Sequence, residues 1–171
     1  ILSAALIACA GMVKVTGFLA LGFVGMNLAR HFLRVGRGPV VSVLLAVVVQ
    51  VALLLATIAL VTAVTGIGLG WVTGQGGAAS IRSWLSMTTD IGIVAGFLGM
   101  LLGLGDHTDT MLLITRGAGV LVAGGFLVRF LFATFRGTIH PVGGLGVATF
   151  VLVILFPVVH PWYMLWAILP L

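Results

Sequence analysis

Three basic side chains are candidates for binding an anion: Lys14, Arg82 and Arg116. Lys14, the only lysine, interrupts an apolar stretch, where an ammonium group is unfavourable unless it snorkels, pairs with an acid or faces a polar cavity. Arg82 stands two residues before Trp84, and Arg116 lies inside a later apolar stretch. Because such groups form charge-assisted hydrogen bonds, Lys14 and Arg82 are candidates for binding a phosphate, and Arg116 is a candidate for lining an outer-facing polar cavity. The alternatives are snorkelling for Lys14 and a headgroup-level arginine beside an interfacial tryptophan for Arg82.

An aromatic motif near the end of the chain, His160-Pro161-Trp162-Tyr163, combines an imidazole, a rigid proline and two large rings. The faces of Trp and Tyr rings stack against the C–H faces of sugars and against isoprenoid chains. Together with Trp84, the motif is therefore a candidate sugar or lipid pocket. The alternative is an aromatic belt at the membrane boundary.

The acidic side chains predict no metal site. Asp106-His107-Thr108-Asp109 places two carboxylates and an imidazole close together, but the spacing matches no ligand pattern, and Thr108 or Asp109 is equally suited to cap the following helix. Asp90 stands just before an apolar run and is expected to cap its helix. We predict no cofactor and no resident metal, with a role for a divalent cation left open.

The composition indicates that these elements lie in lipid. Of the 171 residues, 61% are hydrophobic and 6% are charged, with a mean hydropathy of +1.35. Average globular proteins carry about 25% charged residues, so these values exclude a water-soluble enzyme. At about 20 residues per spanning helix, we expect an all-α, polytopic transmembrane helical bundle in a single domain. The chain starts and stops inside apolar segments, so we expect a fragment of a longer membrane protein lacking its N-terminal part.

Apolar runs, prolines and glycines predict the positions of the helices. Lys14 divides the first run: either one long helix holds it near the middle, or two short helices meet at a break over 14–17. Pro39 suits the first turn of the next helix, and Gly66 ends it. The expected elements are helices over 2–28, 39–65, 111–135 and 141–156, a short segment over 91–104, an outer loop over 66–90, and the start of a further helix over 163–171.

Positive charges orient these helices, and the net charge of +5 is interpreted as a topology signal that predicts no nucleic-acid partner. Two basic clusters are expected on the cytoplasmic side: Arg30, Arg34 and Arg37, then Arg129 and Arg136. They share that side only if the segment 91–104, about 21 Å long as a helix, stays short of crossing the membrane core of roughly 30 Å. The polar segments then collect on the outer face of a multi-pass plasma-membrane protein: 66–90, 105–110 and 157–163.

Several stretches of the chain resemble a known enzyme family. They read AGMVKVTGFLALGFVGM, GLGWVTGQGG, SWLSMTTDIG, GLGDHTDTMLLITRGAGVLVAGG and FPVVHPWYMLWAILPL. Together they resemble the actinobacterial polyprenyl-phosphomannose-dependent α-1,6-mannosyltransferases of the GT-C class, over most of the chain from about Leu6. The resemblance implies a GT-C helical bundle that transfers mannose from a polyprenyl-phosphate carrier to an α-1,6-mannan chain of a lipoglycan. It further implies a single displacement with inversion on the outer face of the plasma membrane.

The resemblance also implies roles for individual residues. Three would bind the donor phosphate: Lys14, Arg82 and Arg116. Four would shape the sugar or lipid pocket: Trp84, His160, Trp162 and Tyr163, with His160 standing where such enzymes usually carry glutamine. The general base of that class lies on the first outer loop, so it is expected upstream of Ile1 and not at Asp90, Asp106 or Asp109. The implied partners are polyprenyl-phosphate-mannose, a mannan or lipoglycan acceptor, and membrane lipids.

Apart from the resemblance, broken helices with an intramembrane lysine are equally typical of a polytopic transporter or lipid flippase. A transporter usually shows paired repeats and polar groups at the membrane midplane, whereas this chain concentrates polar and aromatic residues on one face. That distribution favours transfer chemistry at the interface. A noncatalytic scaffold subunit is the third hypothesis, and it predicts that alanine at Lys14, Arg82 and Arg116 leaves turnover unchanged.

Overall fold

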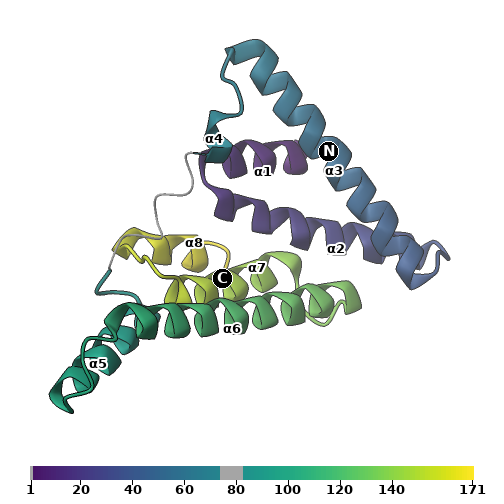
Figure 1. Ribbon diagram of the computed structural model, residues 1–171. Coiled ribbons are helices and arrows are strands. Elements are labelled where there is room, and N and C mark those ends of the chain that lie inside the picture. Colours follow the sequence, from purple (N-terminus) through teal and green to yellow (C-terminus); the bar gives the residue numbers. More distant parts are fainter. Residues whose placement is uncertain (1, 74–82) are drawn as a thin grey trace. The chain divides into compact units, whose positions relative to one another are not determined.

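The computed structural model describes residues 2–73 and 83–171, and every regular element in that part of the chain is a helix (Figure 1). The elements are α1 (Leu2–Val13), η1 (Val15–Phe18), α2 (Leu19–Arg34), α3 (Pro39–Thr65), α4 (Gly70–Thr73), α5 (Met87–Leu101), α6 (Thr108–Arg136), α7 (Pro141–Leu155), η3 (Pro161–Tyr163) and α8 (Met164–Ile168). They form two compact units. The first contains α1 to α4, the end of α6 and the start of α7; the second contains α5, the remainder of α6 and α7, η3 and α8.

Helices α3 and α6 are long and apolar enough to cross a membrane. Only 11% of the most apolar window of each is buried inside the protein, so neither is the core helix of a water-soluble fold. Helices α1, α5 and α7 are also apolar but shorter. With 61% hydrophobic residues, this arrangement is an all-α membrane helical bundle.

The longest apolar helix of the first unit buries its small and polar side chains. In α3 the buried residues are Ser42, Ala46 and Gln50, which share one face, while most of its valines and leucines are half-buried or exposed. This pattern is the reverse of a water-soluble helix, because lipid solvates the apolar face and small residues let helices approach closely. The burial pattern thus agrees with the composition in placing α3 in lipid.

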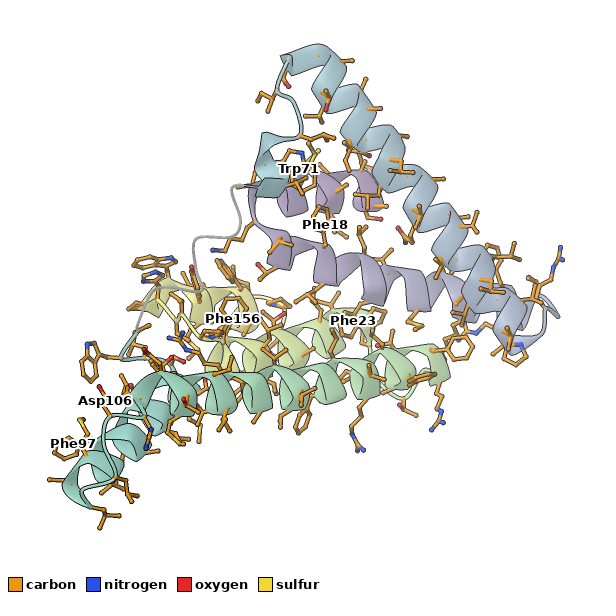
Figure 2. The ribbon with its side chains drawn as sticks, in the orientation of Figure 1. Phe18, Phe23, Trp71, Phe97, Asp106 and Phe156 are labelled. Atoms are coloured by element: carbon orange, nitrogen blue, oxygen red, sulfur yellow. The ribbon has the colours of Figure 1, made fainter. Side chains whose placement is uncertain are left out.

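The first apolar run folds as two helices with a break at Lys14, which is the second of the two arrangements that the sequence leaves open. Lys14 has an extended backbone between α1 and η1, and α2 then runs back alongside α1 (Figure 1). Gly11 and Gly17 permit this reversal: a Cβ on Gly17 would lie 2.9 Å from the backbone nitrogen of Gly11, and one on Gly11 would collide with the ring of Phe18. The Phe18 ring also contacts Trp71 of α4, with ring centroids 5.9 Å apart (Figure 2).

The second unit begins with a helical hairpin. Helix α5 reverses after Leu101, and Gly96 brings it close to Thr108 at the start of α6. Asp106 precedes α6 (Figure 2), and its carboxylate accepts a hydrogen bond from the backbone N–H of Thr108 at 2.9 Å. The sequence had instead assigned Thr108 or Asp109 to this turn. Farther along the chain, the core of the unit forms around Val153, Val159 and Tyr163.

Candidate functional site

Four hydroxyl side chains gather at the N-terminus of α5: Ser83, Ser86, Thr88 and Thr89. Ser86 is the N-cap, because its Oγ accepts a hydrogen bond from the backbone N–H of Thr89 at 3.2 Å. The expectation that Asp90 caps this helix is therefore wrong. Asp90 lies within the first turn, where its charge faces the positive end of the helix dipole. Its Oδ1 is buried and has no hydrogen-bond partner among the described residues.

The same hydroxyl groups bind backbone carbonyls at the end of α7. Thr88 donates to Leu155 at 3.3 Å, Ser86 to Phe156 at 2.7 Å, Thr89 to Pro157 at 2.9 Å and Ser83 to Val159 at 2.5 Å. The last carbonyls of a helix have no partner within the helix, and Pro157 has no N–H with which to continue it. The hydroxyl cluster therefore holds the segment 155–159, which leads directly into the aromatic motif.

Replacing Ser86 by alanine is expected to lower the stability of the full-length protein by about 2 kcal/mol. An N-cap contributes about 1 kcal/mol and the hydrogen bond to Phe156 about 1 kcal/mol more. The measurement is thermal unfolding of the purified protein in detergent. The matched control is Thr57→Ala, because among the described residues the Thr57 hydroxyl bonds only the Leu53 carbonyl of its own helix, and its loss should change stability by less than about 0.5 kcal/mol. Equal melting temperatures for Ser86→Ala and the wild type would contradict the assignment.

Arg116 joins this cluster from α6. Its side chain is half-buried, and Nε donates a hydrogen bond to Oγ1 of Thr89 at 3.2 Å. Helix α6 comes this close because Gly119, one turn later, has no side chain: a Cβ there would lie 2.5 Å from Cγ2 of Thr88 and 3.0 Å from the carbonyl oxygen of Leu155. Thr89 in turn donates to the carbonyl of Pro157, so the Arg116 guanidinium is linked through Thr89 to a residue three positions before His160.

The aromatic motif folds into a stack of rings. The rings of His160 and Trp162 are parallel within 4°, with centroids 4.6 Å apart, and Tyr163 meets His160 edge-on at 5.1 Å. Tyr163 is only 8% exposed and stacks on Trp166 at 4.1 Å, whereas Trp162 is 57% exposed. The motif therefore has a buried anchor, Tyr163, and an accessible indole fixed by its neighbours, which is suitable for stacking on a sugar or an isoprenoid.

The other predicted site residues lie elsewhere. Trp84 is 79% exposed in the turn before α5, and the ring contacts in the described part of the chain do not include it. Lys14 is half-buried in the first unit, whereas Arg116 and the aromatic motif belong to the second. Arg82 lies outside the described residues. Of the seven predicted residues, the described part of the second unit therefore contains Trp84, Arg116, His160, Trp162 and Tyr163, and Thr89 links Arg116 to Pro157 ahead of the aromatic motif.

An apolar groove of about 210 Å³ lies within the first unit, between α2 and α3. Small residues form its floor, and the mostly buried amide of Gln50 lines it. The Oε1 atom of Gln50 has no hydrogen-bond partner among the described residues. Apart from Gln50, the residues that line this groove are apolar.

Comparisons with known proteins find similarity over Thr88, Thr89, Arg116 and the aromatic motif. A family model described as the MptB C-terminal domain matches residues 88–171, from Thr88 through the aromatic motif to the last residue. Over these residues, just under half of the chain, the sequence is similar to that family. Arg116 and the carbonyls that the hydroxyl groups bind lie inside the matched residues, and the N-cap Ser86 precedes them by two residues.

The similarity extends beyond the MptB C-terminal domain to the whole chain. It is 68% identical over 170 residues to alpha-(1->6)-mannopyranosyltransferase B of Corynebacterium glutamicum, covering 99% of this chain and 28% of that relative. The chain is also 45% identical over 166 residues to an alpha-(1->6)-mannopyranosyltransferase of Mycobacterium tuberculosis. That match covers 97% of this chain and 27% of the length of the relative. These matches confirm the resemblance to actinobacterial α-1,6-mannosyltransferases, of which the chain spans under a third. No solved structure matches the chain.

The sequence had not predicted a role for the hydroxyl groups that hold the segment 155–159. Ser86, Thr88, Thr89 and Trp166 are not among the predicted site residues. The sequence does contain one indication of this cluster, because four hydroxyl residues fall within positions 83–89 of a strongly apolar chain. In lipid each such group needs a partner, so a cluster predicts backbone acceptors nearby.

The described part of the chain holds no cluster of metal-ligating side chains. Within residues 2–73 and 83–171, no three His, Cys, Asp or Glu side chains come close enough together to bind one ion.

Proposed function

We propose that the protein containing this chain is a membrane mannosyltransferase of the GT-C class. It takes mannose from polyprenyl-phosphate-mannose and adds it to an α-1,6-mannan chain of a lipoglycan at the outer face of the plasma membrane. The observation that carries the proposal is the 68% identity over 170 residues to an alpha-(1->6)-mannopyranosyltransferase. The link from Arg116 through Thr89 to Pro157, three residues before the aromatic motif begins, supports it.

The proposed reaction is a single displacement with inversion. The bond between C1 of mannose and the phosphate oxygen breaks while an acceptor hydroxyl oxygen bonds to C1 and releases its proton. The leaving polyprenyl phosphate gains a negative charge, so hydrogen bonds from a guanidinium to that phosphate strengthen in the transition state. The proposal assigns the donor phosphate to Lys14, Arg82 and Arg116, and it assigns no general base within these residues.

The proposed pocket uses the aromatic motif for the sugar or the lipid. The exposed indole of Trp162, fixed by His160 and Tyr163, provides a flat face for a mannose ring or an isoprene unit, and Trp84 is proposed to contribute a second face. The apolar groove between α2 and α3 is a suitable site for part of the polyprenyl chain. A divalent cation is not part of this proposal.

The test uses membranes that contain the full-length protein, labelled polyprenyl-phosphate-mannose and a short α-mannoside acceptor. We expect labelled product with a new α-1,6 linkage, at the same rate with or without a chelator of divalent cations. No product from protein that elutes as a monodisperse species would contradict the proposal and favour a transporter or a lipid flippase. A rate that falls in the chelator and returns with added magnesium or manganese would contradict the metal-free version.

A further inference from the structure

Two hydrogen bonds on Thr89 have directions determined by chemistry. A guanidinium only donates and a backbone carbonyl only accepts. The single hydroxyl hydrogen of Thr89 therefore goes to the Pro157 carbonyl at 2.9 Å, and an oxygen lone pair accepts from Nε of Arg116 at 3.2 Å. The two hydrogen bonds therefore run from Arg116 in α6 through Thr89 in α5 to Pro157, just after α7, and each bond polarises the next.

Thr89 is rigidly held, whereas an arginine side chain is flexible. Thr89 is fully buried, occupies the first turn of α5, and donates its backbone N–H to the N-cap Ser86. Its β-branched side chain has few rotamers in a helix. An arginine side chain carries about 2 kcal/mol of rotamer entropy, and fixing Nε fixes the plane that contains all five N–H donors.

We infer that Thr89 is a positioning residue that orients the Arg116 guanidinium for binding the phosphate of a polyprenyl-linked donor. This inference rests on the proposed function. The same hydroxyl group binds Pro157, three residues before His160, so it also sets the position of Arg116 relative to the aromatic motif.

The hydrogen bonds around Thr89 distinguish orientation of Arg116 from simply holding the segment that follows α7. Ser86 and Thr88 hold the carbonyls of Phe156 and Leu155 independently of Thr89. Loss of the Thr89 hydroxyl therefore leaves two of the three consecutive carbonyl contacts in place. Arg116, by contrast, loses the acceptor that holds its Nε.

The experiment compares Thr89→Val, which keeps the side-chain shape without the hydroxyl, with Thr89→Ser, which keeps the hydroxyl. Each is made in the full-length protein, with Arg116 intact and in an Arg116→Ala background. Binding of a short-chain prenyl phosphate to purified protein is measured by calorimetric titration, and mannose transfer is measured in parallel. We expect Thr89→Val to weaken binding about five- to tenfold and Thr89→Ser to stay within about twofold of the wild type. In the Arg116→Ala background, Thr89→Val should cause no further loss.

Two outcomes would overturn the inference: unchanged binding by well-folded Thr89→Val, or the same loss from Thr89→Val with and without Arg116. If Thr89→Val elutes as aggregate, Thr89→Ala replaces it, because the smaller side chain leaves room for water at the Pro157 carbonyl. Failure of the proposed function gives a different result. In that case the wild type binds prenyl phosphate with the predicted dependence on Thr89 but transfers no mannose.

Discussion

Replacing Arg116 by alanine is expected to reduce mannose transfer by roughly 10- to 100-fold while the amount of folded protein stays unchanged. A hydrogen bond to a charged group contributes about 1.5–3 kcal/mol, and each 1.36 kcal/mol is a factor of ten in rate. Because the charge on the phosphate grows as the bond to mannose breaks, the loss should affect kcat as well as the KM for the donor. Initial rates over a range of donor concentrations measure both.

Two further substitutions make the Arg116 experiment specific. Arg116→Lys keeps the charge but loses the planar group that meets Thr89, so we expect an intermediate rate. Arg129→Ala removes an exposed arginine from the same helix and should stay within about twofold of the wild type. Full activity of Arg116→Ala, or an equal loss in Arg129→Ala, would remove Arg116 from the donor site.

Replacing Gly96 by alanine is expected to destabilise the protein by about 1–3 kcal/mol, the range for overpacking a tight contact. A Cβ at Gly96 would lie 2.6 Å from the backbone Cα of Thr108. Backbone atoms cannot rotate aside as a long side chain does, so α5 and α6 must separate. Since α5 carries Thr89 and α6 carries Arg116, the separation should also lengthen the hydrogen bond between them.

The matched control for Gly96 is Gly99→Ala on the same helix. There the nearest atom to an added Cβ is the Gly105 carbonyl oxygen at 3.8 Å, which is an ordinary contact. Alanine is favoured over glycine inside a helix by about 0.5–1 kcal/mol, so this variant should be equal to or slightly more stable than the wild type. Thermal unfolding of both variants in detergent measures the difference. A Gly96→Ala protein as stable as Gly99→Ala would contradict the close packing of the hairpin.

Several features of the fold are predictable because their causes are local or compositional. Few charges and many apolar residues identify lipid as the solvent, whatever the arrangement of the helices. The boundaries of α3 follow from Pro39, whose ring suits a first turn, and from Gly66, which adopts a left-handed φ of +68°. The sequence left open whether the run around Lys14 forms one helix or two, because that choice depends on how closely Gly11 and Gly17 pack.

The hydrogen-bond partners within the site could not be predicted from the sequence, because they depend on tertiary packing. Asp90 and Ser86 are both good capping residues, and only the backbone at Ser86 shows which of them begins α5. The sequence had singled out Arg116 as a charge inside an apolar stretch, but nothing in the residues near it indicates that Thr89 accepts its Nε–H. Arg82 lies outside the described residues, so its predicted role stays a prediction.

Composition and local pattern were therefore sufficient for the solvent, the helical class, the family resemblance and the residues of the aromatic motif. The tertiary structure alone pairs the hydroxyl groups of residues 86–89 with the carbonyls of residues 155–157, which lie 67 to 70 positions away in sequence. A hydroxyl in lipid must find an acceptor, but many carbonyls satisfy that need equally well. The choice among them is made by how α5, α6 and α7 pack, and Gly92, Gly96 and Gly119 allow that packing only through contacts between distant parts of the chain.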